Sequence, residues 1–240
     1  MKISTIAICS VALLAMLIGA CQRPVTPQDV SEATQQPMAP LIIEPGAQQF
    51  SIVPEESRLL VRVYRGGRLA QMGHNHIISS NDLRGEVYLS EQLESSVFEV
   101  RLPVATMAVD KPELRTAAGD DFPGELDQDA VDGTRANMLG DAQLAADQWP
   151  EILVRGRAIS GELPDLRVRM DIGVRSNTFA LEVPVQVSAD ADGLRANARF
   201  TVRQTELGIE PFSVMMGALQ VRDELEIELS LVARPVETSD

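Results

Sequence analysis

Apolar and polar residues alternate along much of the second half of the chain. The clearest case is the segment ALQVRDELEIELSLVA at 218–233, in which leucine, valine and isoleucine alternate with glutamine, arginine, glutamate and serine. Side chains of a β-strand point alternately to its two faces, so this pattern predicts a strand with one buried and one solvated face. The same alternation predicts strands at 166–174, 179–187 and 194–202.

Five further segments are predicted as strands, at 58–65, 68–79, 83–90, 96–104 and 151–160. Turn-forming stretches such as ADADG and ISGELPD separate neighbouring strands. Many strands at short spacing favour an all-β fold, either an antiparallel sandwich or a barrel.

One segment breaks the pattern. Residues 134–148, TRANMLGDAQLAADQ, space their apolar side chains at helical intervals and are followed by Trp149 and Pro150, which predicts one helix. The segment before it, 119–133, carries six acidic residues among glycine and proline. Its spacing does not fit the calcium-binding loop of an EF-hand, so we expect a solvated acidic loop.

The N-terminus has the pattern of a targeting segment. Lys2 is followed by an apolar run up to Cys21, which predicts a signal peptide over 1–20. The run is also near the length of a membrane span, so an uncleaved anchor is the alternative. The IGAC sequence at its end resembles the lipobox of bacterial lipoproteins, which implies cleavage before Cys21 and its lipidation. Because Gln22 follows in place of aspartate, the resemblance points to an outer-membrane lipoprotein on the periplasmic side of the bacterial envelope.

The chain after the signal peptide is expected to consist of a tether, one domain and a short tail. Residues 21–48 are rich in proline, glutamine and small polar residues, so the lipidated cysteine is expected to begin a flexible tether. One domain at 49–235 and a disordered tail at 236–240 follow. The only other cysteine, Cys9, lies in the signal peptide, which leaves the domain without a disulfide, a thiol nucleophile or a cysteine metal site.

Charge and motifs exclude two classes of function. The net charge is −14 and no basic cluster interrupts it, which argues against a nucleic-acid partner. The chain lacks a GxSxG elbow and a glycine-rich phosphate loop, and no carboxylate pair can be singled out among its 35 acidic residues. We therefore expect a protein that is not an enzyme and holds no cofactor.

The segment LAQMGHNHIISS at 69–80 holds both histidines of the chain, His74 and His76. Side chains two positions apart on a strand share a face, so both imidazoles could bind one metal ion. A third ligand would have to be a carboxylate of the acidic segment or a methionine, namely Met72, Met215 or Met216. Alternatively, the histidines are structural or contact a ligand head group at the mouth of a pocket.

Arg203 and Glu206 also allow two interpretations. They could form an ion pair that closes one end of a barrel. Arg203 could instead bind the diphosphate of a ligand, because a guanidinium suits bidentate recognition of phosphate.

Several motifs occur in the order found in the YceI-like family. The stretch ARFTVRQTELGIEPFSVMMGALQVRDELEIELSLVA resembles the end of that family, and GHNH resembles the GHxH segment of one of its subgroups. The stretch NMLGDAQLAADQWPEILVRGR resembles a helix followed by a PEI motif and a strand, and LRGEVYLS resembles a further strand. The resemblance spans about residues 50–233 and is loosest at 170–178.

This resemblance implies a lipocalin-like antiparallel β-barrel of about eight strands with one helix packed against it, enclosing an elongated apolar pocket. In the family this pocket holds a long polyisoprenoid chain, and no catalytic mechanism is established. We therefore expect the chain to bind a long apolar ligand, such as a polyisoprenoid or a quinone, as a carrier, store or sensor. The alternatives are an envelope metal-binding protein that uses His74 and His76, and a structural or partner-binding barrel with a filled core.

Inward-facing positions of the expected strands supply the candidate pocket lining. The residues expected there are Val100, Leu102, Val168, Met170, Ile172, Phe179, Leu181, Val183, Phe200 and Val202. At the mouth of the pocket we expect His74, His76 and Arg203. Small residues beside bulky ones, such as Gly85 beside Val87, would leave space for a ligand.

Overall fold

The structure is a computed structural model that describes residues 38–237. The predicted signal peptide, Cys21 and the tether up to residue 37 lie outside this range, as does the end of the predicted tail. The strands of the described range are β1 (Gln48–Ile52), β2 (Arg58–Gly66), β3 (His76–Ser80), β4 (Arg84–Leu89), β5 (Val97–Pro103), β6 (Ala108–Val109), β7 (Glu151–Glu162), β8 (Asp165–Val174), β9 (Asn177–Asp190), β10 (Gly193–Arg203), β11 (Ser213–Val214) and β12 (Leu219–Pro235). Its α-helices are α1 (Pro112–Ala118) and α2 (Gln128–Leu139).

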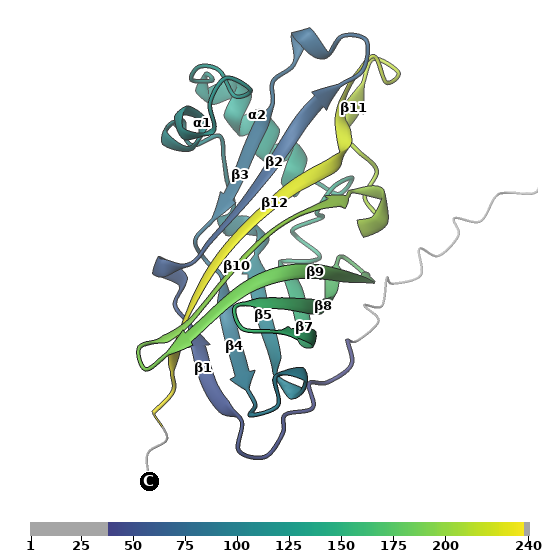
Figure 1. Cartoon of the computed structure of the whole chain (residues 1–240). Helices are drawn as coiled ribbons and strands as arrows, with labels where there is room; N and C mark the ends of the chain where they lie inside the picture. The colour runs from purple at the N-terminus through teal and green to yellow at the C-terminus, as the bar shows by residue number, and fades with distance from the viewer. Residues whose placement is uncertain (1–37, 238–240) are drawn as a thin grey trace, which may run out of the picture. The chain divides into compact units, whose positions relative to one another are not determined.

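Eight of these strands close into an antiparallel barrel. Their order is β1, β4, β5, β7, β8, β9, β10 and β12, and β12 pairs with β1 to complete the ring. The strands β2, β3 and β6 extend the sheet from β12, and Figure 1 shows α1 and α2 beside them. The predicted all-β, lipocalin-like barrel is confirmed, with two helices in the described residues where one was expected.

Strand β12 joins the barrel to its extension. It pairs along one side with β10, from Arg203 opposite Glu224 to Leu194 opposite Ala233. On its other side it pairs first with β2, up to Ser230, and then with β1 from Ala233 onward. A single long strand therefore holds the barrel closed and carries β2, β3 and β6.

The alternation of side chains divides the inside of the barrel from the outside. Between β10 and β12, Ala198 lies opposite Leu229 and lines the interior, whereas Arg199 lies opposite Glu228. The guanidinium of Arg199 is 3.3 Å from the Glu228 carboxylate on the outer face. Period-two alternation thus places aliphatic groups inside and ion pairs outside, as the sequence predicts.

The predicted strand at 68–79 is wrong for most of its length. Only His76–Ser80 forms a strand, and Ala70–Met72 form a single turn of 3-10 helix. Gly67 has a positive φ of +84°, and a Cβ atom at this residue would lie 2.5 Å from the carbonyl oxygen of Ala218. The chain turns here because glycine permits both the conformation and the close approach.

The predicted helix at 134–148 has the wrong bounds. Helix α2 begins within the acidic segment, because Asp127 caps it by accepting a hydrogen bond from the N–H of Ala130 at 2.8 Å. It ends at Gly140, and turns follow. Part of the expected acidic loop is therefore the first half of a helix, where carboxylates are favoured by the helix dipole.

Gly85 provides a test of how tightly the barrel strands pack. It has a φ of +138°, and a Cβ atom there would collide with the carbonyl oxygen of Glu99 in β5. Its role is thus the close approach of two strands and not space for a ligand. We expect Gly85→Ala to lower the free energy of unfolding by about 2 kcal/mol or more, as measured by urea denaturation.

The matched control is Gly133→Ala, in the interior of α2. A Cβ atom at Gly133 meets no atom within 4 Å, so alanine should stabilise the helix by about 0.5–1 kcal/mol. Equal effects of the two substitutions would contradict this account of Gly85.

Candidate functional site

An apolar cavity of about 430 Å³ lies inside the barrel. Inward-facing side chains of the barrel strands line it together with residues of β2, β3 and α2. Leucine, isoleucine and valine predominate, and Ala196 and Ala198 of β10 add small side chains beside Phe200. The lining can therefore contact an apolar molecule along the interior of the barrel.

Most of the expected lining residues lie along this cavity. Seven of them line it, namely Val100, Leu102, Val168, Met170, Ile172, Phe200 and Val202. Phe179 and Leu181 line a second hollow, which they share with Ile172 and Val202. Val183 is buried in the apolar cluster around Val168 and Met170 and does not line the cavity.

Few polar side chains line the cavity. They are His76, Ser96, Thr134, Asn137, Gln143 and Gln204. His76 is distinct among them because its ring contacts Asp110, which forms a buried ion pair with Arg115. The cavity is thus an apolar site with a small number of polar groups, which is typical of small-molecule sites.

His76 stands at the start of β3, next to a buried carboxylate. Its Nδ1 atom lies 2.6 Å from Oδ2 of Asp110, and the N–H of Ile77 donates to Oδ1 of Asp110 at 2.9 Å. The side chain of Asp110 is fully buried, and the residue has a positive φ of 53°, a conformation that aspartate adopts more readily than most residues. The turn after β6 therefore fixes the position of the carboxylate.

Arg115 of α1 neutralises this carboxylate. Its Nη1 atom donates to Oδ1 of Asp110 at 2.8 Å, and the arginine side chain is only 2% exposed. The same guanidinium donates to the carbonyl oxygens of Asn75, Pro123 and Gly124. We call this group, made of His76, Asp110 and Arg115, the buried triad.

The buried triad keeps Asp110 ionised. Burial alone would raise the pKa of this carboxyl, but hydrogen bonds from His76, Ile77 and Arg115 outweigh it and lower the pKa below its ordinary value. Since an ionised carboxylate only accepts hydrogen bonds, the Nδ1 atom of His76 carries the proton and donates it to Asp110.

Sequence reasoning missed Asp110 and Arg115. They lie 34 and 39 residues after His76 in the chain, with no motif or regular spacing between them. The only available signal was a basic residue, Arg115, in an acidic part of the chain. A signal of this kind does not identify a partner.

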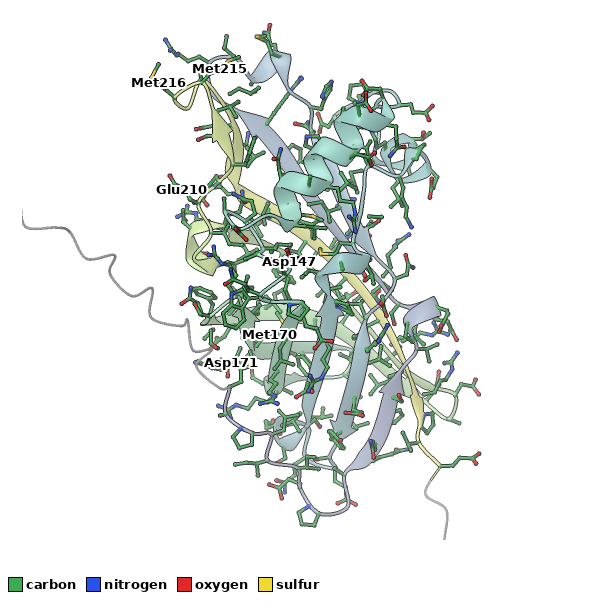
Figure 2. The ribbon with its side chains drawn as sticks, turned by 180° about the vertical axis from the view of Figure 1, so that it is seen from behind. Asp147, Met170, Asp171, Glu210, Met215 and Met216 are labelled. Atoms are coloured by element: carbon green, nitrogen blue, oxygen red, sulfur yellow. The ribbon has the colours of Figure 1, made fainter. Side chains whose placement is uncertain are left out.

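His74 is a neighbour of the triad and not one of its members. It is exposed and does not line the cavity, and the centroid of its ring is 6.4 Å from that of His76. Figure 2 shows Met215 and Met216 on the loop between β11 and β12, directed away from the barrel, and Met72 is also exposed. Within residues 38–237, no three histidine, cysteine or acidic side chains gather in a way that could hold a metal ion.

Arg203 faces the outside of the barrel. Its guanidinium is 3.6 Å from the carboxylate of Glu224, and its backbone N–H donates to Oε2 of Glu206 at 3.3 Å. The expected side-chain ion pair between Arg203 and Glu206 is therefore wrong. Arg203 also does not line the cavity, because Val202 takes the inward position next to it.

The described end of the predicted tether contacts the barrel. Arg155 of β7 donates to the carbonyl oxygens of Met38 and Ala39, at 3.1 and 2.9 Å. No helix in the described residues has the length and apolar character needed to cross a membrane.

Removal of one partner from the buried triad should destabilise the fold. Arg115→Met leaves the buried Asp110 without its cation, so we expect a loss of about 3–5 kcal/mol in the free energy of unfolding. The matched control is Arg101→Met, at a surface pair with Glu99 in which the arginine is 46% exposed, where the loss should stay below about 1 kcal/mol. If urea denaturation gave equal losses of unfolding free energy for Arg115→Met and Arg101→Met, this account of the buried pair would be wrong.

One of the solved structures that this chain matches shares its fold. The crystal structure of Burkholderia cenocepacia BcnA matches with a TM-score of 0.56 at 11% sequence identity, covering 75% of this chain and 98% of that one. A crystal structure of the Campylobacter jejuni YceI protein matches with a TM-score of 0.45, and a mutant of that protein with a monobromobimane guest matches with 0.46. Both are 6% identical to this chain, and each match covers 65% of this chain and 82% of the other. No protein-family model and no curated protein matches the sequence. At these identities the likeness to BcnA shows that the two proteins have a similar fold, and no more.

Proposed function

We propose that this chain binds a long apolar ligand, such as a polyisoprenoid or a quinone, inside its barrel. The observation that carries the proposal is the apolar cavity of about 430 Å³. Its size falls in the range of roughly 300–1,000 Å³ that is usual for small-molecule sites. Ordered water needs two or more polar partners, and most of this lining offers none.

The cavity favours a binding protein over a purely structural barrel. Protein interiors are normally packed as densely as organic crystals, with few voids larger than a water molecule. Side chains that line an unfilled cavity lose the dispersion contacts that a packed interior would supply. An apolar ligand restores these contacts when it occupies the cavity.

The place of action we propose is the bacterial cell envelope. Support comes from the sequence, where the lipobox-like IGAC ends an apolar run and a proline-rich segment follows Cys21. A lipid anchor at Cys21 would hold the barrel at a membrane, which is where polyisoprenoids and quinones partition. The chain would act there as a carrier, store or sensor, without chemistry of its own.

Native mass spectrometry of the full chain, purified from a bacterial host without chelator, tests the proposal. We expect an adduct of several hundred daltons that extracts into organic solvent. Ala198→Phe places a ring inside the cavity and should remove most of the adduct, while Thr201→Phe, on the outer face of the same strand, should retain it. A protein without adduct that also takes up no added polyisoprenoid or quinone would exclude the proposal. A metal-sized adduct that is lost in His74→Ala would favour the metal alternative.

Cys21→Ser tests the proposed anchor. If Cys21 is lipidated, we expect the wild-type chain in the membrane fraction to incorporate a radiolabelled fatty acid and the variant to incorporate none. A wild-type chain that carries no label and still lies in the membrane fraction would indicate an uncleaved apolar anchor instead.

A further inference from the structure

The polar lining of the cavity differs in how far its hydrogen bonding is already satisfied. Ser96 accepts from the N–H of Ser90, and Thr134 donates to the carbonyl oxygen of Ala130. Gln143 and Gln204 donate their amide protons to the carbonyl oxygens of Glu210 and Arg222, and Asn137 is exposed.

His76 lines the same cavity with one ring nitrogen committed and the other available. Its Nδ1 atom is bound to Asp110, which is fully buried and does not line the cavity. The edge of an imidazole opposite Nδ1 carries Cδ2 and Nε2, so this edge is turned away from Asp110. In the described residues no hydrogen bond involves Nε2 of His76.

We propose that the Nε2 atom of His76 holds a hydroxyl group of the bound apolar ligand. The inference rests on the proposed function and names the chemical class of the ligand's polar end, an alcohol or a phenol. With its proton on Nδ1, a neutral imidazole presents a lone pair at Nε2 and accepts from the hydroxyl. A protonated imidazole donates from Nε2, and the hydroxyl oxygen then accepts. A hydroxyl group can therefore form a hydrogen bond with both the neutral and the protonated ring.

The buried triad makes this contact directional. Asp110 fixes the ring through Nδ1, and Arg115 and the N–H of Ile77 fix Asp110 in turn. The ring of His76 is 15% exposed and its neighbours in the cavity, such as Val63 and Ile78, are aliphatic. A polar atom in such surroundings gains from a partner, and the Nε2 lone pair of the neutral ring stays unpaired when a ligand has no hydrogen-bond donor.

The test compares an alcohol with its methyl ether, which has the same chain but cannot donate a hydrogen bond. The full chain, stripped of bound lipid, is loaded with the fluorescent apolar probe N-phenyl-1-naphthylamine, and 1-decanol or decyl methyl ether displaces it. The readout is the ratio of the two dissociation constants, ether over alcohol. We expect this ratio to fall by roughly three- to tenfold in His76→Phe, with the ether bound as in the wild type.

A second variant controls for misfolding of His76→Phe. His76→Asn keeps an N–H donor beside Asp110 and replaces Cδ2 by a carbonyl oxygen, which lies about one bond length short of the former Nε2, so the ratio should fall here too, by less than in His76→Phe. The same experiment on His74→Phe tests the exposed neighbouring ring, and a fall confined to that variant would overturn the assignment to His76.

The remaining outcomes separate this inference from the proposed function. If both molecules displace the probe and the ratio is the same in the wild type, His76→Phe and His76→Asn, the hydroxyl contact is wrong while the apolar site stands. If neither the probe nor either molecule binds the wild-type chain, the proposed function fails, and the hydroxyl contact fails with it.

Discussion

Closure of the sheet through β12 is the constraint on which the rest of the molecule depends. An open sheet leaves a row of unpaired backbone groups at each edge, and pairing of β12 with β1 joins the two end strands of the eight-strand ring, while the sheet continues from β12 into β2, β3 and β6. Closure also fixes which face of every strand lies inside. Because those faces carry mostly valine, leucine and isoleucine, with Ala196 and Ala198 between larger residues, the ring encloses an apolar space that its own side chains do not fill.

The long strands could be predicted from the sequence because their two faces meet different environments. The pattern at 166–174 and 194–202 matches β8 and β10 to within about one residue at each end. Short elements left no such pattern, so β1, with five residues, and β6 and β11, with two residues each, were missed. The start of α2 was missed because its acidic first turn reads as a loop until Asp127 is recognised as its cap.

Strand alternation also explains which residues of the candidate site could be predicted from the sequence. Alternation assigns a face to each strand residue, so Val168, Met170 and Ile172 could be placed along the interior from the sequence. The buried triad depends on contacts between segments that are far apart in the chain, and no local pattern marks such contacts. His76 was noticed because histidine is rare in this chain, but its partners became known only from the structure.

The four backbone and side-chain acceptors of Arg115 have a consequence for local opening of the fold. This one side chain ties the segment before β3 to the turn after β6 and to the segment that precedes α2. Separating these segments would break these bonds and expose a buried charge pair, at a cost of several kcal/mol. Such a cost protects the backbone amides of this region from hydrogen exchange by local opening, because the open population falls about tenfold for every 1.4 kcal/mol.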